Sequence, residues 1–310
     1  MKILLELPTW LGDAVMATPA IEALLAHYKK AQITLFGAYA STEALKAHPR
    51  VTQVVVDRTK EGFRLYNLYR TAKALGPHDL ALSFRSHLAS KLLLKLTQST
   101  QTYQYKKTAG SRHQVARYQA FVDHVTGQEE SPGPLRLYWP RKTFAHPTIG
   151  INPGATYGSA KRWYPDKFAD VAAHFASRYD IVIFGGPKEV DIATQIETHL
   201  RKKGITNVVN LAGQTTIPEL CSTIGGCELF VTGDSGPMHI AAAYRVPTVA
   251  IFGPTKHLET SPWAHPGARI VRHDLACAPC MKRTCPLKHH ACMREISADE
   301  VIEAATRLLV

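Results

Sequence analysis

The stretch LFVTGDSGPMHIAAA, residues 229–243, decides the fold class of this 310-residue chain. Its first part, Leu229–Thr232, is an apolar run of the kind that forms a buried strand. A turn with two glycines follows, and we expect a helix from Pro237 onward, because proline is favoured in the first turn of a helix. Repeated strand–turn–helix units build α/β folds with a parallel sheet.

The same alternation extends from this stretch over the whole chain. A first series of strands is expected at Lys2–Leu7, Ile33–Phe36, Val51–Val56 and Leu80–Phe84. A second series is expected at Ile149–Asn152, Ile181–Phe184, Val208–Leu211, Leu229–Thr232 and Thr248–Phe252. Helix-like segments follow most strands, at 19–28, 42–47, 63–75, 86–96, 166–177, 190–201, 218–224 and 237–243. The sequence therefore predicts two Rossmann-like, doubly wound α/β domains.

A segment typical of a linker separates the two series. Residues 127–147 are rich in glycine, proline and mixed charges. We expect a first domain over residues 1–147, linker included, and a second over 148–310. The two would face a central cleft, since ligands of doubly wound folds bind at the carboxyl ends of the strands. A last helix, Ser297–Leu309, is expected to start with a capping box and is a candidate to pack back on the first domain.

The composition is that of a folded globular protein. Apolar residues make up 45% of the chain and charged residues 20%, which excludes a disordered or collagen-like chain. No apolar stretch approaches the ~18 residues of a membrane span. Glu6, Pro8 and Asp13 interrupt the apolar start, so we interpret it as a buried strand rather than a signal peptide. A cytoplasmic protein is predicted.

The positive charge is concentrated in the first half of the chain. The formal net charge is +12, and residues 1–148 hold 20 lysines and arginines against 10 aspartates and glutamates. No carboxylate lies between Asp79 and Asp123, where seven cations occur: Arg85, Lys91, Lys95, Lys106, Lys107, Arg112 and Arg117. Such a surface attracts nucleic acid, anionic lipid head groups or phosphorylated sugars. A solvated helix face that carries lysines for solubility is an equally weighted alternative.

The end of the first strand carries a candidate general base. The strand leads into Pro8-Thr9-Trp10-Leu11-Gly12-Asp13, and a carboxylate at this edge could accept a proton from a substrate hydroxyl. The alternative is that Asp13 is a helix N-cap. A helix N-terminus and nearby cations would lower its pKa and weaken it as a base, whereas the apolar neighbours Trp10 and Leu11 would oppose this by desolvation.

Three later turns have the character of phosphate or sugar sites. Gly154 in the turn after Asn152, with Lys161 just beyond, could hold a phosphate through backbone N–H groups and a point charge. Glu189 could accept hydrogen bonds from sugar hydroxyls, or it could simply complement a helix dipole. The turn that contains Asp234 is the most specific, because Ser235 can cap the next helix, whose exposed N–H groups suit a pyrophosphate.

The chain resembles the bacterial lipopolysaccharide heptosyltransferases of glycosyltransferase family 9. The motifs that carry the resemblance run in order along the chain: Gly12-Asp13 with Thr18-Pro19, Asn152-Pro153-Gly154-Ala155 with Lys161-Arg162-Trp163, Gly233-Asp234-Ser235-Gly236-Pro237-Met238-His239, and Phe252-Gly253-Pro254-Thr255. The resemblance implies a GT-B fold with an acceptor domain followed by a donor domain. It also implies inverting transfer of L-glycero-D-manno-heptose from ADP-heptose to the first heptose of the inner core.

The resemblance also implies roles for individual residues. Asp13 would be the catalytic base. The donor ADP-heptose would be bound by Gly12, Thr156, Lys161, Glu189, Asp234, Ser235, Gly236 and His239. The acceptor, a Kdo-lipid A core, would meet the basic residues Arg85, His87, Lys106 and Arg112 at the inner face of the inner membrane, with the protein held peripherally and no transmembrane segment. The family needs no cofactor or DxD-bound metal for the chemistry, and no obvious DxD motif occurs.

A cysteine cluster near the end of the chain is not explained by this function. Cys277, Cys280, Cys285 and Cys292 have the spacing C-x2-C-x4-C-x6-C, with histidines nearby. Clustered thiols in a cytosolic protein suggest a metal before a disulfide, although the spacing fits neither a zinc ribbon nor a ferredoxin. A bound metal and a structural or redox loop both remain open.

Two functional alternatives also remain open. The first is a heptosyltransferase of another acceptor type, either type I or a later core enzyme, because the motifs do not resolve the acceptor. The second is a basic, metal-clustered nucleic-acid-binding protein. The cysteine cluster lies in the nearly neutral half, whereas nucleic-acid binding needs basic and recognition elements together, so no nucleic-acid partner is expected.

Overall fold

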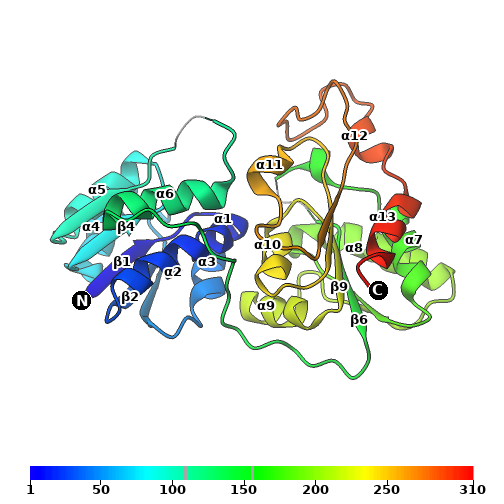
Figure 1. The fold of residues 1–310 in the computed structure, drawn as a ribbon, viewed down its shortest axis with the longest axis horizontal. Coiled ribbons are helices and arrows are strands. Elements are labelled where there is room, and N and C mark those ends of the chain that lie inside the picture. The colour runs from blue at the N-terminus through cyan, green and yellow to red at the C-terminus, as the bar shows by residue number, and fades with distance from the viewer. Residues whose placement is uncertain (108–109, 155–156, 310) are drawn as a thin grey trace. The chain divides into compact units, whose positions relative to one another are not determined.

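The computed structural model describes residues 1–107, 110–154 and 157–309. It divides into two compact units, Met1–Tyr138 and Trp139–Val310 (Figure 1). The division lies nine residues before the expected boundary because the end of the linker is bonded to the second unit. The Tyr244 hydroxyl donates to the Trp139 carbonyl at 2.8 Å, and the Lys142 N–H donates to the Ser222 carbonyl at 2.9 Å.

The first unit is built on a five-stranded, all-parallel sheet with the order β3-β2-β1-β4-β5. Its strands are β1 (Lys2–Glu6), β2 (Gln32–Gly37), β3 (Val51–Val56), β4 (Leu80–Ser83) and β5 (Gln101–Gln104). The first four match the predicted strands. β5 was not predicted, because a short edge strand of sequence QTYQ has no apolar run to reveal it.

Two groups of helices cover this sheet. One group contains α1 (Leu11–Met16), α2 (Thr18–His27), α3 (Tyr39–Leu45) and α6 (Gln114–Thr126), which pack on one another. The other contains α4 (Arg64–Leu75) and α5 (Leu88–Leu96), which lie side by side (Figure 1). Leu68 of α4 and Leu93 of α5 pack against Leu4 and Phe36 of the sheet. Helix α6 was missed, although its buried residues Val115, Tyr118, Phe121 and Val122 have helical spacing.

The second unit holds a six-stranded parallel sheet with the order β11-β10-β9-β6-β7-β8. Its strands are β6 (Thr148–Asn152), β7 (Asp180–Ile183), β8 (Val208–Asn210), β9 (Leu229–Gly233), β10 (Thr248–Ile251) and β11 (Ala268–Val271). The chain runs outward from β6 to β8 and then returns to β9 on the other side of β6. This reversal is a topological switch point, where doubly wound folds bind their ligands.

The helices of the second unit enclose this sheet. They are α7 (Pro165–Phe175), α8 (Val190–Lys202), α9 (Ile217–Gly226), α10 (Gly236–Ala243), α11 (His257–Thr260), α12 (Ala291–Arg294) and α13 (Ala298–Thr306), with 3-10 turns at Ser159–Lys161 and Pro187–Glu189. The predicted capping box at Ser297 and Glu300 is confirmed. Within the described ranges, no helix is both long and apolar enough to cross a membrane.

The last helix belongs to the second unit. α13 packs against α7, β10 and β11, and its buried residues Val301 and Ala305 join the core around Phe168 and Ile251. Its buried residues serve the core of the unit in which it lies. Packing of this helix on the first domain as well stays a prediction.

Candidate active site

The first unit presents Asp13 at the carboxyl edge of its sheet. β1 ends at Glu6, a four-residue loop follows, and Asp13 is the third residue of α1. Trp10 occupies the N-cap position, so Asp13 is not the N-cap that the alternative interpretation required. Gly12, beside it, is buried. Burial, and after it the negative charge of Asp13, raises the pKa of Tyr118 on α6 well above its usual range, which places this phenol near the carboxylate.

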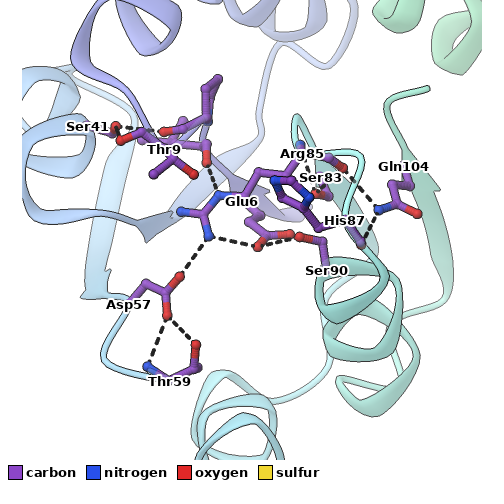
Figure 2. A network of polar contacts seen from close by, with 12 residues as sticks. Glu6, Thr9, Ser41, Asp57, Thr59, Ser83, Arg85, His87, Ser90 and Gln104 are labelled. Atoms are coloured by element: carbon purple, nitrogen blue, oxygen red, sulfur yellow. Dashed lines mark hydrogen bonds and ion pairs between the residues drawn. The ribbon is translucent and has the colours of Figure 1, made fainter. Parts of the chain in front are cut away.

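A polar network centred on Arg85 holds the loop before Asp13 (Figure 2). The Arg85 Nε donates to the Leu7 carbonyl at 2.7 Å. Its Nη1 lies 2.7 Å from Asp57 Oδ2 and 3.3 Å from Glu6 Oε1. From the other side, the Ser41 hydroxyl donates to the Pro8 carbonyl at 2.7 Å. The loop is therefore fixed by residues from several different segments of the first unit.

The two carboxylates of this network respond to it differently. Burial raises the pKa of Glu6, although the charge of Arg85 and hydrogen bonds from serines oppose the rise. Burial acts in the same direction on Asp57, but hydrogen bonds from Thr59 and Arg85 outweigh it and leave the pKa of Asp57 below its usual value. Only 10% of the Arg85 side chain is exposed. Arg85 thus lies inside the unit as the cation between two acids.

Removing the Ser41 hydroxyl should loosen this loop. We expect Ser41→Ala to lower the free energy of unfolding by about 1–3 kcal/mol, because the buried Pro8 carbonyl loses its donor. Turnover should fall severalfold, with donor affinity unchanged. Urea unfolding and steady-state kinetics measure both effects. The exposed Ser86→Ala is the control and should stay within about 0.5 kcal/mol of wild type; equal behaviour of the two variants would contradict the role of Ser41.

The other predicted acceptor residues lie near β5. Lys106 and Arg112 line one cavity of about 670 Å³, together with Tyr103, Tyr105 and His124. His87 has an exposed side chain, and its carbonyl accepts a hydrogen bond from Gln104 at 2.8 Å. The structure therefore groups Lys106 with Arg112 and assigns Arg85 to the buried network.

The second unit gathers its predicted residues at the switch point. The Asn152 amide, at the end of β6, donates to the hydroxyls of Thr232 and Ser235 at 3.0 Å each. Ser235 occupies the N-cap position of α10, as predicted, but makes no side-chain capping bond, because its hydroxyl is turned toward Asn152. Gly236 opens α10, and His239 is buried in the same helix.

A buried ion pair lies at this edge. Lys161 Nζ is 2.6 Å from Asp234 Oδ2, and the two side chains are only 11% and 8% exposed. The Thr255 hydroxyl donates to the same oxygen at 2.6 Å. An ammonium group near the start of a helix suits an anionic diphosphate, because both favour negative charge.

The turn after β7 contacts the turn after β6. The Gly186 N–H donates to Glu189 Oε2 at 2.8 Å, and Glu189 is 7% exposed. A Cβ on Gly154 would lie 2.1 Å from the same oxygen, so this close approach requires glycine at 154. The predicted donor residue Thr156 lies outside the described residues.

The cysteine-rich segment, residues 277–292, forms hydrogen bonds with the turn that contains Lys161. The Ala160 N–H donates to the Arg283 carbonyl at 3.0 Å, the Tyr157 hydroxyl donates to the Met281 carbonyl at 2.8 Å, and a His290 ring nitrogen lies 2.9 Å from the Ala160 carbonyl. These contacts give the segment a structural role that the sequence did not reveal.

Cys292 lies near the three other cysteines of the cluster. Burial, followed by the neighbouring Cys277, Cys280 and Cys285, raises the pKa of Cys292 to about 11. In the part of the chain that the structure describes, no three His, Cys, Asp or Glu side chains are arranged to hold a metal ion. A bound metal at these cysteines stays a prediction, and the contacts with the Lys161 turn give the segment a structural role beside it.

At Gly158, the backbone of this turn lies close against the cysteine-rich segment. A Cβ there would lie 2.3 Å from the Arg283 carbonyl oxygen, so Gly158→Ala must push two backbone segments apart. We expect a loss of about 1–3 kcal/mol in the free energy of unfolding and weaker binding of the nucleotide-sugar donor that the resemblance implies. Gly133→Ala, where a Cβ meets nothing within 4 Å, is the matched control. Donor titration calorimetry and urea unfolding of both variants test this. A Gly158→Ala variant with wild-type stability and donor affinity would contradict this role of the cysteine-rich segment.

Comparisons with known proteins agree with these features. The model of glycosyltransferase family 9 (heptosyltransferase) matches residues 69–291. Lipooligosaccharide heptosyltransferase 2 of Campylobacter jejuni is 43% identical, over 100% of this chain and 98% of the relative. Lipopolysaccharide heptosyltransferase 2 of Escherichia coli K12 is 28% identical, over 100% and 99%. Among solved structures, E. coli ADP-heptose LPS heptosyltransferase II matches with a TM-score of 0.82 at 24% identity, over 100% and 98%.

These matches settle the class of the protein. The solved structure shares the architecture of two parallel-sheet α/β domains, which is the predicted GT-B fold. The family model covers most of the second unit, including Lys161, Glu189 and Asp234, and the relatives extend the match over the whole chain. The chain belongs to glycosyltransferase family 9, the heptosyltransferase family.

Proposed function

We propose that this protein transfers L-glycero-D-manno-heptose from ADP-heptose to the first heptose of the lipopolysaccharide inner core, with inversion. The observation that carries the proposal is the buried Lys161–Asp234 pair at the switch point beside α10. The 43% identity to a heptosyltransferase 2 over the full chain supports this acceptor type. One relative named heptosyltransferase 3 is 25% identical over 82% of the chain, and another is 40% identical over only 33% of it.

The proposed chemistry is a single displacement. The acceptor hydroxyl oxygen attacks the anomeric carbon of the donor and forms the new C–O bond, while Asp13 takes the hydroxyl proton. The bond between the anomeric carbon and the phosphate oxygen breaks at the same time, and the electron pair leaves with ADP. Attack from the side opposite the leaving group inverts the configuration of the anomeric carbon.

The second unit would hold the donor and stabilise the leaving group. Lys161 and the N–H groups at the start of α10 would meet the growing charge on the diphosphate, a contribution that is usually the largest in such reactions. Asp234 and His239 would contact the heptose side and Glu189 the ribose or adenine side. We assign each of these roles from the position of the residue in the motifs shared with the family.

The first unit would hold the acceptor. Lys106 and Arg112 line a cavity that could bind the carboxylates and phosphates of a Kdo-lipid A core, since both residues are cations. Because that acceptor is anchored in lipid, we place the protein at the cytoplasmic face of the inner membrane, in peripheral contact with its anionic surface.

ADP release with defined acceptors tests the proposal. Core acceptors with zero, one or two heptoses are incubated with ADP-heptose and the purified protein. Turnover on the one-heptose acceptor alone is expected. Turnover on the heptose-free acceptor would make the protein a type I enzyme, turnover only on the two-heptose acceptor would make it a later core enzyme, and no turnover on any acceptor would overturn the proposal.

A further inference from the structure

Helix α4 and its N-cap residue, Phe63, expose large apolar side chains where a surface helix normally carries polar ones. Phe63, Leu65, Tyr66 and Tyr69 are 73%, 61%, 55% and 52% exposed. The opposite side of the helix is already occupied, because Leu68, Ala72 and Leu75 pack into the core of the first unit. The exposed residues therefore do not serve this core, and grouped apolar exposure of this kind marks an interaction surface.

Cations surround these aromatic side chains. Residues 58–73 contain one carboxylate, Glu61, and five exposed cations: Arg58, Lys60, Arg64, Arg70 and Lys73. The Arg70 Cζ lies 5.7 Å from the centre of the Tyr66 ring. We define residues 58–73 as the α4 face. Aromatic rings interleaved with lysine and arginine match the interface of an anionic bilayer, where rings sit among the head groups and cations meet the phosphates.

The topology puts the first part of the α4 face at the edge of the first unit that carries Asp13. α4 follows β3, so its first turns lie where the parallel strands have their carboxyl ends. α1, which carries Asp13, starts at the same edge after β1, and α5 starts there after β4 with Leu88 81% exposed. A lipid held against the α4 face would thus carry its sugars on the same side of the unit as Asp13.

We propose that the α4 face is the surface by which this protein docks on an anionic lipid bilayer. The inference rests on the proposed function, because a lipid-anchored acceptor gives such docking its purpose. The bilayer is favoured over a second copy of the chain by charge complementarity, since two copies of so basic a face repel each other.

Vesicle sedimentation tests the proposal with the full-length protein. Vesicles of phosphatidylethanolamine and phosphatidylglycerol are compared with vesicles of phosphatidylcholine alone. Wild type should sediment with the anionic vesicles only. Arg64→Gln/Arg70→Gln should weaken this binding about 30-fold, since each cation near an anionic surface contributes about fivefold, and Phe63→Ser/Tyr66→Ser/Tyr69→Ser should weaken it at least about 10-fold.

Two controls remove side chains of the same kinds, cationic or apolar, elsewhere. Lys29→Gln/Lys30→Gln removes two exposed cations before β2, at the opposite edge of the same sheet, and Val209→Ser removes an exposed apolar side chain from β8. Both should bind anionic vesicles like wild type. Three results would each overturn the proposal. The first is equal weakening by the lysine control, and the second is no weakening by either α4 variant. The third is concentration-dependent self-association of the protein that the α4 variants abolish.

A second readout separates this inference from the proposed function. The α4 variants should turn over a de-acylated, water-soluble one-heptose acceptor at the wild-type rate, which also shows that they fold. They should lose at least about 10-fold with the fully acylated one-heptose acceptor embedded in anionic vesicles. Wild type that fails with the soluble acceptor contradicts the proposed function. Wild type that succeeds with it, but whose vesicle reaction is indifferent to the α4 changes, contradicts only the docking surface.

Discussion

Replacing Asp13 with asparagine is expected to lower turnover about 1,000-fold, the usual size of a general-base contribution. The amide keeps the size of the side chain but cannot accept the proton of the acceptor hydroxyl. Asp13 lies in the first turn of α1, behind a loop that Arg85 and Ser41 hold in place, so the substitution should leave the backbone unchanged. The rate of ADP release under saturating substrates measures the loss.

Donor affinity supplies the control for this variant. Because the proposal assigns ADP-heptose mainly to the second unit, Asp13→Asn should bind it with the affinity of wild type in a calorimetric titration. Turnover within about tenfold of wild type would remove Asp13 as the base, since that is less than general-base catalysis typically supplies. Loss of donor binding together with turnover would instead give Asp13 a binding role.

Lys161→Met is expected to act on catalysis and on stability together. Loss of the cation should lower kcat/KM about 100- to 1,000-fold, the scale found when one electrostatic stabiliser of a leaving charge is removed. It also leaves the buried Asp234 carboxylate with the Thr255 hydroxyl but no cation, which should cost about 3–5 kcal/mol in the free energy of unfolding. Steady-state kinetics and urea unfolding measure the two losses.

A double variant separates the two losses. Lys161→Met/Asp234→Asn removes both charges, so most of the stability should return, while turnover should not, because the diphosphate still lacks its cation. Lys202→Met, at an exposed position of α8, is the control for a general effect of charge. Recovery of turnover in the double variant would show that Lys161 only neutralises Asp234.

The alternation of strands and helices was readable because buried parallel strands are apolar along their whole length. The stretch 229–243 forms β9 and α10 close to the predicted bounds. The edge strands β5 and β11 were not predicted, because they are half exposed and contain polar residues such as Gln101 and Arg269. For the same reason, patterns locate the centre of such a sheet better than its margins.

Some residues of the candidate site could likewise be predicted from the sequence, and others could not. Lys161, Asp234 and Ser235 stand directly at strand ends or in turns, so motif position was enough to bring them together. The role of Arg85 could not be predicted, because its partners Leu7 and Asp57 lie 78 and 28 residues away in the chain. The cysteine-rich segment shows the same limit: its contacts with Tyr157 and Ala160 span more than 120 residues.

During synthesis, the loop before Asp13 can form its contacts only after the residues of the Arg85 network have been made. Leu7 and Pro8 leave the ribosome early, but Ser41, Asp57, Arg85 and Ser90 must follow before the contacts around them can close. Contacts of such sequence separation form late in folding, because the intervening chain must first be ordered. A nascent chain that ends before residue 85 therefore carries Asp13 behind a loop that is not yet fixed, and the proposed position of this carboxylate arises only when β4 has joined the sheet.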